Sequence, residues 1–224
     1  MSPTRPRLGR AAGLRPAALP TRVALCRHGE PDASALGRFC GAIDVGLSAV
    51  GEAEARALAG SLAGAQAEAL YTSPARRALE TSGPIGDRLT LEPIMEPRLR
   101  ELDFGEVDGL PYEDVAAHRP ELYAEWLRAP TQVRFPGGEC YGDLQRRTLA
   151  ALSAITTRHE QATTVVVTHA GVIRALLGAW LSLPDEAVFR IDQRYGSVNV
   201  VDWLDGAPVV RIVNGPPASP VRVV

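Results

Sequence analysis

Short apolar runs alternate with stretches of helical periodicity along most of this chain. The runs are rich in β-branched residues, are bounded by turn residues, and predict strands at 23–27, 68–72, 164–168, 197–203 and 208–213. Between them, apolar residues recur at helical spacing. Strands that alternate with helices predict an α/β fold, a three-layer αβα sandwich in which helices cover both faces of a mostly parallel central sheet.

The helical stretches carry recognisable start and stop signals. Ser48 is a predicted N-cap for a helix that runs to about Gly64. Its apolar face is expected to comprise Val50, Ala57, Leu58 and Leu62. Ser73 and Pro74 have the pattern of an N-cap followed by an N1 proline, which predicts a second helix that Gly83-Pro84 ends or kinks. Further helices are predicted near 112–127, 142–158 and 171–182.

One domain is predicted to begin near Thr21. Residues 1–20 contain several arginines and no acidic residue, and we interpret them as a flexible N-terminal arm. Residues 21–224 are long enough to form a single α/β domain with a sizeable core. The stretch 92–140 is less regular and is predicted to be an insertion that lies over the strand ends and helps to shape the active-site pocket.

Composition narrows the chemistry. The chain is 46% hydrophobic and 22% charged with a net charge of −2, which predicts a soluble protein with no general attraction to nucleic acid or membrane. It contains no lysine, so Schiff-base chemistry, a pyridoxal-phosphate site and a Walker A lysine are excluded. The cysteines Cys26, Cys40 and Cys140 are scattered, which argues against a disulfide framework and a thiolate zinc site and favours the reducing cytoplasm.

Two of the predicted strands end in a histidine. The apolar run 23–25 continues into Cys26-Arg27-His28-Gly29-Glu30, and strand 164–168 is followed directly by His169. Such strand ends open into the crevice where α/β proteins bind ligands. A neutral His28 imidazole could attack phosphorus, and flanking arginines should lower its pKa and keep it neutral. The alternative is a purely structural histidine, which is how we interpret His118 and His159.

Arg27 and Arg77 are candidate ligands for an anion. A guanidinium is planar, stays charged and matches two phosphate oxygens. Arg77 follows the predicted N-cap at Ser73, whereas Arg76 beside it should face another way. With His169, the two arginines could surround a phosphoryl group, although each arginine alone could be a solvated surface charge. A metal site at the histidines is disfavoured because the sequence has neither H-E-x-x-H nor a tight ligand cluster.

An acidic residue completes the candidate set. Glu101 lies in Leu99-Arg100-Glu101-Leu102-Asp103-Phe104-Gly105, an apolar, glycine-flanked stretch near the expected pocket. A carboxylic acid there could protonate a leaving alcohol. Asp103 and Glu106 are local rivals, and chemistry alone does not rank the three.

The segment Arg27-His28-Gly29-Glu30 resembles the signature of the histidine phosphatase superfamily, which has the phosphoglycerate-mutase-like fold. Four further segments, at 73–81, 99–109, 137–139 and 167–174, resemble the family's motifs and occur in its order. The resemblance implies that Arg77 binds phosphate, that Glu101 is the proton donor, and that His169 is the second histidine.

This resemblance implies a metal-independent phosphomonoester hydrolase that needs no cofactor. His28 would take the phosphoryl group while Arg27, Arg77, His169 and the Ala170 N–H hold its oxygens, and water would then cleave the phosphohistidine. Three residues depart from the family pattern. Pro31 stands where threonine or serine is frequent, which removes a hydroxyl and an N–H. Ala170 replaces a common glycine, which a backbone contact tolerates. Cys140 stands where serine is usual, and would either weaken a hydrogen bond near the phosphate or be a small buried residue.

The short stretch between Glu101 and Glu139 favours hydrolysis, because cofactor-dependent mutases have a much longer insertion there that excludes water. Residues 37–48 resemble α-ribazole phosphatases and broad-specificity phosphatases, so the expected partner is a small phosphomonoester such as α-ribazole 5′-phosphate. Mutase-type transfer on a phosphoglycerate and a non-catalytic phospho-ligand-binding module are the alternatives. The complete set of His28, Glu101 and His169 argues against the module. A homodimer is left open.

Overall fold

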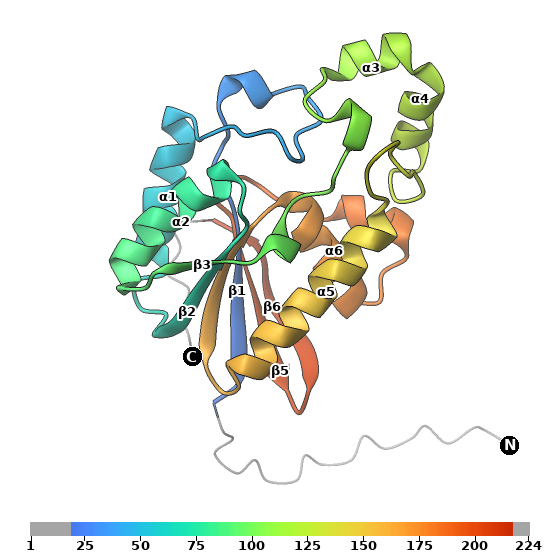
Figure 1. Ribbon diagram of the computed structural model, residues 1–224. Helices are drawn as coiled ribbons and strands as arrows, with labels where there is room; N and C mark the ends of the chain where they lie inside the picture. The colour runs from blue at the N-terminus through green and yellow to red at the C-terminus, as the bar shows by residue number, and fades with distance from the viewer. Residues whose placement is uncertain (1–18, 217–224) are drawn as a thin grey trace, which may run out of the picture.

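A six-stranded sheet forms the centre of the molecule (Figure 1), and the computed structural model describes residues 19–216. The strands are β1 (Thr21–Arg27), β2 (Ala67–Thr72), β3 (Pro93–Met95), β4 (Thr163–Thr168), β5 (Val198–Leu204) and β6 (Ala207–Gly215). Their order is β3-β2-β4-β1-β5-β6. The first four run parallel, and β5 and β6 form an antiparallel hairpin beside β1. The predicted α/β fold with a mostly parallel sheet is confirmed. Residues 1–18 of the predicted arm lie outside the described residues.

Helices cover both faces of the sheet. The four that pack on it are α1 (Ala49–Ser61), α2 (Arg76–Leu89), α5 (Tyr141–Arg158) and α6 (Ala170–Trp180), and Figure 1 shows α1 and α2 on one face and α5 and α6 on the other. Alternate side chains of β1 enter different cores, as the pleat of a strand requires. Ala24 and Cys26 pack on the α1 and α2 side, whereas Val23 and Leu25 pack against α5 and α6. This alternation explains the unbroken apolar run in β1.

The pairing of β1 with β4 fixes the position of the two histidines. The strands are parallel with Arg27 opposite Thr168, and the His28 N–H donates to the Thr168 carbonyl at 3.0 Å. His28 and His169 therefore leave the sheet side by side. The edge at which β1 and β4 end is called the exit edge below, and the edge at which they begin is called the entry edge.

Helix α1 is capped as predicted, and half of its predicted apolar face is buried. The Ser48 hydroxyl accepts from the Gly51 N–H at 3.0 Å. Leu58 and Leu62 are buried, which confirms that part of the prediction, whereas Val50 and Ala57 are exposed. The first turn of the helix faces inward through Gly51 instead, because the backbone after β1 approaches it closely and a Cβ on Gly51 would lie 2.0 Å from the Glu30 carbonyl oxygen.

Helix α2 begins later than predicted and does not end at Gly83-Pro84. Ala75 is its N-cap residue, and the Ser73 hydroxyl accepts from the Ala75 N–H at 3.3 Å while it also contacts His169 Nε2 at 2.7 Å. Pro84 lies inside the helix, which continues to Leu89.

The segment at 112–127 is two helices and not one. They are α3 (Tyr112–His118) and α4 (Pro120–Arg128). Arg119 between them has φ −136° and ψ 58°, because a residue that precedes proline is displaced from the helical region.

The stretch 92–140 contributes to two parts of the molecule. Its first residues form β3, an unpredicted edge strand that pairs with β2. The remainder contains three-residue 3₁₀ turns at Pro97–Leu99 and Gly105–Val107 and the helices α3 and α4, which Figure 1 shows beyond the exit edge. This part has its own apolar cluster of Phe39, Val107, Val115, Val133 and Phe135. Residues 33–35 and 185–190 form two further 3₁₀ turns.

Candidate active site

His28 is buried at the exit edge with one ring nitrogen engaged. Its Nδ1 lies 2.7 Å from the Gly29 carbonyl oxygen. A carbonyl only accepts, so Nδ1 carries the proton and Nε2 keeps its lone pair. Burial lowers the pKa of His28 well below 6.5, and the charges of Arg77 and Arg27 lower it further. The predicted direction is retained, although burial outweighs the arginines as its cause. The imidazole is therefore a neutral nitrogen base at neutral pH.

His169 lies against His28 and is held by a serine. The two ring centroids are 5.0 Å apart, and the Ser73 hydroxyl lies 2.7 Å from His169 Nε2. Burial, followed by the charge of Arg77, lowers the pKa of His169 well below 6.5. When its Nε2 accepts from Ser73, Nδ1 carries the proton and can donate to an oxygen. Ala170 is the first residue of α6, so its N–H belongs to the open first turn of that helix.

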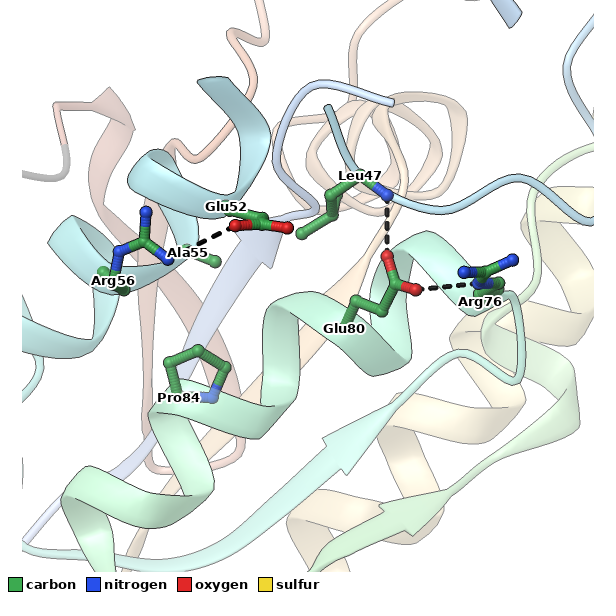
Figure 2. Close-up of a pocket in the computed structure, with 7 residues that line it drawn as sticks. All are labelled: Leu47, Glu52, Ala55, Arg56, Arg76, Glu80 and Pro84. Atoms are coloured by element: carbon green, nitrogen blue, oxygen red, sulfur yellow. Dashed lines mark hydrogen bonds and ion pairs between the residues drawn. The ribbon is translucent and has the colours of Figure 1, made fainter. Parts of the chain in front are cut away.

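Arg77 is fully buried and has no carboxylate partner. Its Nη atoms donate to backbone carbonyls of the loop after β1, to Ile43 at 3.1 Å, Cys40 at 3.2 Å and Gly41 at 2.8 Å. These bonds fix the guanidinium plane but leave its charge without a counter-ion. The prediction that only one of Arg76 and Arg77 faces inward is confirmed. Figure 2 shows Arg76 in an outer pocket between α1 and α2, where it pairs with Glu80 at 2.7 Å.

Arg27 lies between a carbonyl and an aromatic ring. One Nη atom donates to the Gln193 carbonyl at 2.5 Å, and the guanidinium carbon lies 3.7 Å from the centre of the Tyr195 ring. Burial lowers the pKa of Arg27 although Tyr195 and Glu101 oppose that shift. Tyr195 also lies beside His28, with ring centroids 5.7 Å apart. It forms an aromatic wall of the site.

The unpartnered polar atoms gather at this site. Within residues 19–216, five buried side-chain nitrogen or oxygen atoms have no hydrogen-bond partner, and three of them are Nε of Arg27, Nε of Arg77 and Nδ1 of His169. An unsatisfied buried polar group costs about 1–3 kcal/mol. These groups are donors, or can be, and they belong to residues that lie near the neutral His28. The arrangement is suited to an anion with several oxygens.

Glu101 is held at the start of α6. Its Oε2 accepts from the Gly171 N–H at 3.0 Å, and its Oε1 accepts from the Leu102 N–H at 2.9 Å. A side chain at position 171 would displace this carboxylate, because a Cβ there would lie 2.2 Å from Glu101 Oε1. The rivals are placed differently. Asp103 accepts from Gly105 within its own turn, and Glu106 is exposed and paired with Arg119 at 2.7 Å. Glu101 is thus the acid beside the second histidine.

Comparison with known proteins agrees with this geometry. The model of the histidine phosphatase superfamily, branch 1, matches residues 23–215. The chain belongs to the histidine phosphatase superfamily.

Two relatives and two solved structures illustrate the likeness. A bifunctional protein of Mycobacterium tuberculosis is 35% identical over 95% of this chain, which spans only 57% of that relative's length. Phosphoserine phosphatase 1 of Hydrogenobacter thermophilus is 33% identical over 72% of this chain and 77% of its own. A mycobacterial glucosyl-3-phosphoglycerate phosphatase shares 26% identity and a TM-score of 0.79 over 87% of this chain and 98% of its own. The α-ribazole phosphatase of Shigella flexneri shares the fold, with a TM-score of 0.80 at 24% identity over 90% and 99%.

Residues 137–139, which resemble one of the family's motifs, support the segment that carries Glu101. Glu139 accepts from the side chains of Arg147 and Arg100, at 2.8 and 3.0 Å, beside the segment that carries Glu101. Cys140, in place of the usual serine, is half-buried and is the N-cap of α5, where its thiol and backbone form a capping box with Asp143. The expectation of a small buried residue was therefore wrong, because the side chain faces the helix end.

Sequence reasoning missed three contributors to the site. Tyr195 lies in the irregular segment before β5, where no periodicity marks it. Ser73 looked like a helix cap but bonds to His169. Thr81 accepts from the Gly29 N–H at 3.0 Å and donates to the Arg77 carbonyl at 2.7 Å, which links the segment after β1 to α2. One feature of the sequence could have indicated Thr81, because this polar residue lies one helical turn after Arg77 on a buried face.

The described part of the chain contains no cluster of three or more histidine, cysteine, aspartate or glutamate side chains arranged for a metal ion. None of its helices has the length and apolar character needed to cross a bilayer.

Proposed function

We propose that this histidine phosphatase hydrolyses phosphomonoesters of small metabolites through a phosphohistidine at His28. The observation that carries the proposal is that three buried nitrogens without a partner, on Arg27, Arg77 and His169, belong to residues that lie near a neutral histidine whose Nδ1 is held by a carbonyl. Arginine forks and an N–H at a helix start suit a phosphoryl group. No step calls for a metal or a cofactor, and we propose that none is used.

The first step forms one bond and breaks one. The lone pair of His28 Nε2 attacks phosphorus, the P–O bond to the alcohol breaks, and that oxygen takes a proton from Glu101. Arg27, Arg77 and His169 stabilise the charge on the three non-bridging oxygens throughout. A fixed positive environment serves this purpose because charge is spread over those oxygens in the transition state.

The second step restores the enzyme. Water attacks phosphorus, the N–P bond breaks, and the Glu101 carboxylate takes the proton that the water loses. His28 regains its lone pair, and phosphate leaves. Because Nδ1 stays bonded to Gly29 in both steps, the ring keeps one tautomer and one orientation.

We infer the substrate class from the positive charge of the site, and the relatives suggest the test compounds. The named relatives act on phosphoserine, on glucosyl-3-phosphoglycerate and on α-ribazole phosphate. These esters differ in the alcohol and share the phosphoryl group, which is also what the clustered cations would bind. We propose α-ribazole 5′-phosphate and phosphoserine as the first candidates, and a cytoplasmic location, which three unpaired cysteines suit.

The proposal is tested by phosphate release, with EDTA present, from a panel of these esters, sugar phosphates and nucleotides. The wild type should release phosphate from at least one ester, and His28→Ala should lower kcat/KM by at least about 10³-fold, because no other group can take the phosphoryl group. Rapid acid-free quenching with labelled ester should trap phosphohistidine in the wild type alone. A panel without turnover, accompanied by conversion of 3- to 2-phosphoglycerate, would instead establish a mutase. Binding of phosphate without either reaction would establish a ligand-binding module.

A further inference from the structure

We propose that Arg147 is a positioning residue for the reaction. It sets the location of the Glu101 carboxyl group through hydrogen bonds to the main chain of the Glu101 segment. The inference rests on the proposed function, in which Glu101 is the proton donor. Arg147 is on α5 and touches none of the reacting atoms. Its side chain is 12% exposed, and it lies on the side of the Glu101 segment that faces α5.

All five N–H groups of Arg147 are used on one short segment and its anchor. One Nη atom donates to the carbonyls of Arg98 and Arg100, each at 2.7 Å. The other donates to the Glu101 carbonyl at 2.8 Å and to Glu139 at 2.8 Å, and Nε donates to the second oxygen of Glu139 at 2.8 Å. Three carbonyls within four residues are thus fixed by a single rigid plane.

Glu139 ties the other side of the segment to the same guanidinium. Its backbone N–H donates to the Asp103 carbonyl at 2.9 Å, and its carboxylate accepts from the Asp103 N–H at 3.3 Å. The main chain is therefore held on both sides of Glu101, by Arg147 at Arg100 and Glu101 and by Glu139 at Asp103.

The carboxyl group of Glu101 has little room to move. Oε2 is 3.0 Å from the Gly171 nitrogen, and the space above Gly171 is so narrow that a methyl group would overlap Oε1. A displacement of the segment moves the carboxyl group off α6 and away from the leaving oxygen. Misplacement of a reacting group by about 1 Å can cost 10²-fold in rate. Lysine cannot replace this function, because one ammonium cannot span three carbonyls and a carboxylate.

The experiment compares two esters on each enzyme preparation. An alkyl phosphate needs the proton from Glu101, whereas p-nitrophenyl phosphate has a leaving group that hardly needs one. The ratio of their kcat/KM values does not depend on the fraction of folded enzyme, so loss of stability cannot imitate the effect. The variants are Arg147→Met and Arg147→Lys, with Glu101→Gln as reference. Arg146→Met is the matched control, since Arg146 is adjacent, 77% exposed and paired only with Asp143.

We expect Arg147→Met to lower the alkyl-to-aryl ratio by about 10²-fold, in the direction of Glu101→Gln. Arg147→Lys should lower it nearly as much, and Arg146→Met should leave it unchanged. The double variant Arg147→Met/Glu101→Gln should show no lower ratio than Glu101→Gln alone. An Arg147→Met enzyme that loses both esters equally, while Glu101→Gln discriminates between them, would overturn the positioning proposal alone. If Glu101→Gln does not discriminate, the acid role in the proposed function fails instead.

Discussion

The arginine and histidine side chains at the entry edge of the central sheet are paired, whereas those at the exit edge keep polar atoms without a partner. Strand β1 has Arg22 near its start and Arg27 at its end. At the entry edge, Arg22 donates to both oxygens of the buried Asp202, at 2.5 and 2.8 Å. At the exit edge, Arg27 and Arg77 bond to neutral carbonyls and leave one nitrogen each without a partner.

The histidines that flank β4 repeat the contrast. His159, before the strand, lies 3.0 Å from the Tyr71 hydroxyl and 2.9 Å from Glu68, so both ring nitrogens are engaged. His169, after the strand, has one engaged nitrogen and one without a partner. A fold selected for stability alone would complete both edges, because buried cations without anions are costly. The incomplete edge is therefore the one at which a ligand is expected.

The largest effect should follow from making the entry edge resemble the exit edge. Asp202→Ala removes the acceptor of Arg22 and leaves a buried cation unpaired, so the free energy of unfolding should fall by about 3–5 kcal/mol. Urea unfolding measures this change. The specific activity per folded molecule should stay at the wild-type value. Arg211→Met, which removes only the half-exposed partner of Asp202, should cost less than about 1 kcal/mol. An equal loss in both variants would contradict the contrast between the edges.

The next effect concerns the reverse change at the exit edge. Arg27→Met removes a desolvated charge and one hydrogen bond, so stability should change by no more than about 1 kcal/mol. Activity should nevertheless fall by about 10²–10³-fold, because a charged donor aimed at the phosphoryl oxygens is lost. Urea unfolding and kcat/KM on one ester measure the two quantities. A large fall in stability without a fall in activity would make Arg27 a structural residue.

The most gradual effect is the pH dependence of stability at the exit edge. The pKa values of His28 and His169 are well below 6.5 in the folded protein, chiefly because both rings are buried. The unfolded chain therefore binds their protons first as the pH falls. Stability should decrease below pH 6.5 by up to about 1.4 kcal/mol per pH unit for each histidine, until the folded pKa is reached. His169→Gln should reduce that slope. A wild-type free energy of unfolding that does not change between pH 7 and 5 would disprove this prediction.

The sequence predicted five of the six described strands and the two histidines because both depend on local patterns. A buried run followed by a histidine marks a strand end, and parallel strands bring their ends to one edge. Glu101 needed the family resemblance, since three acids in one loop are equivalent until the position of α6 is known.

The features of the fold and site that the sequence did not predict depend on contacts between distant segments. Ser73 has the local pattern of an N-cap, but His169 offers it a partner 96 positions away. Val50 was expected in the core, yet the close backbone approach turns the first turn of α1 inward through Gly51 instead. Tyr195 has no pattern of its own and contributes only because its segment passes over Arg27. Such roles follow from register and packing, which a single sequence does not encode locally.

The parallel pairing of β1 with β4 also has a kinetic consequence. The two strands that lead into the histidines lie far apart in the sequence, and α1, β2, α2, the whole of 92–140 and α5 are synthesised between them. Contacts of such long sequence separation form late, because closing the intervening chain costs entropy before any contact repays it. Recovery of phosphatase activity during refolding should therefore lag behind the recovery of helical signal. The active site then reports completion of the fold, and fragments that lack either strand end are inert towards phosphate esters.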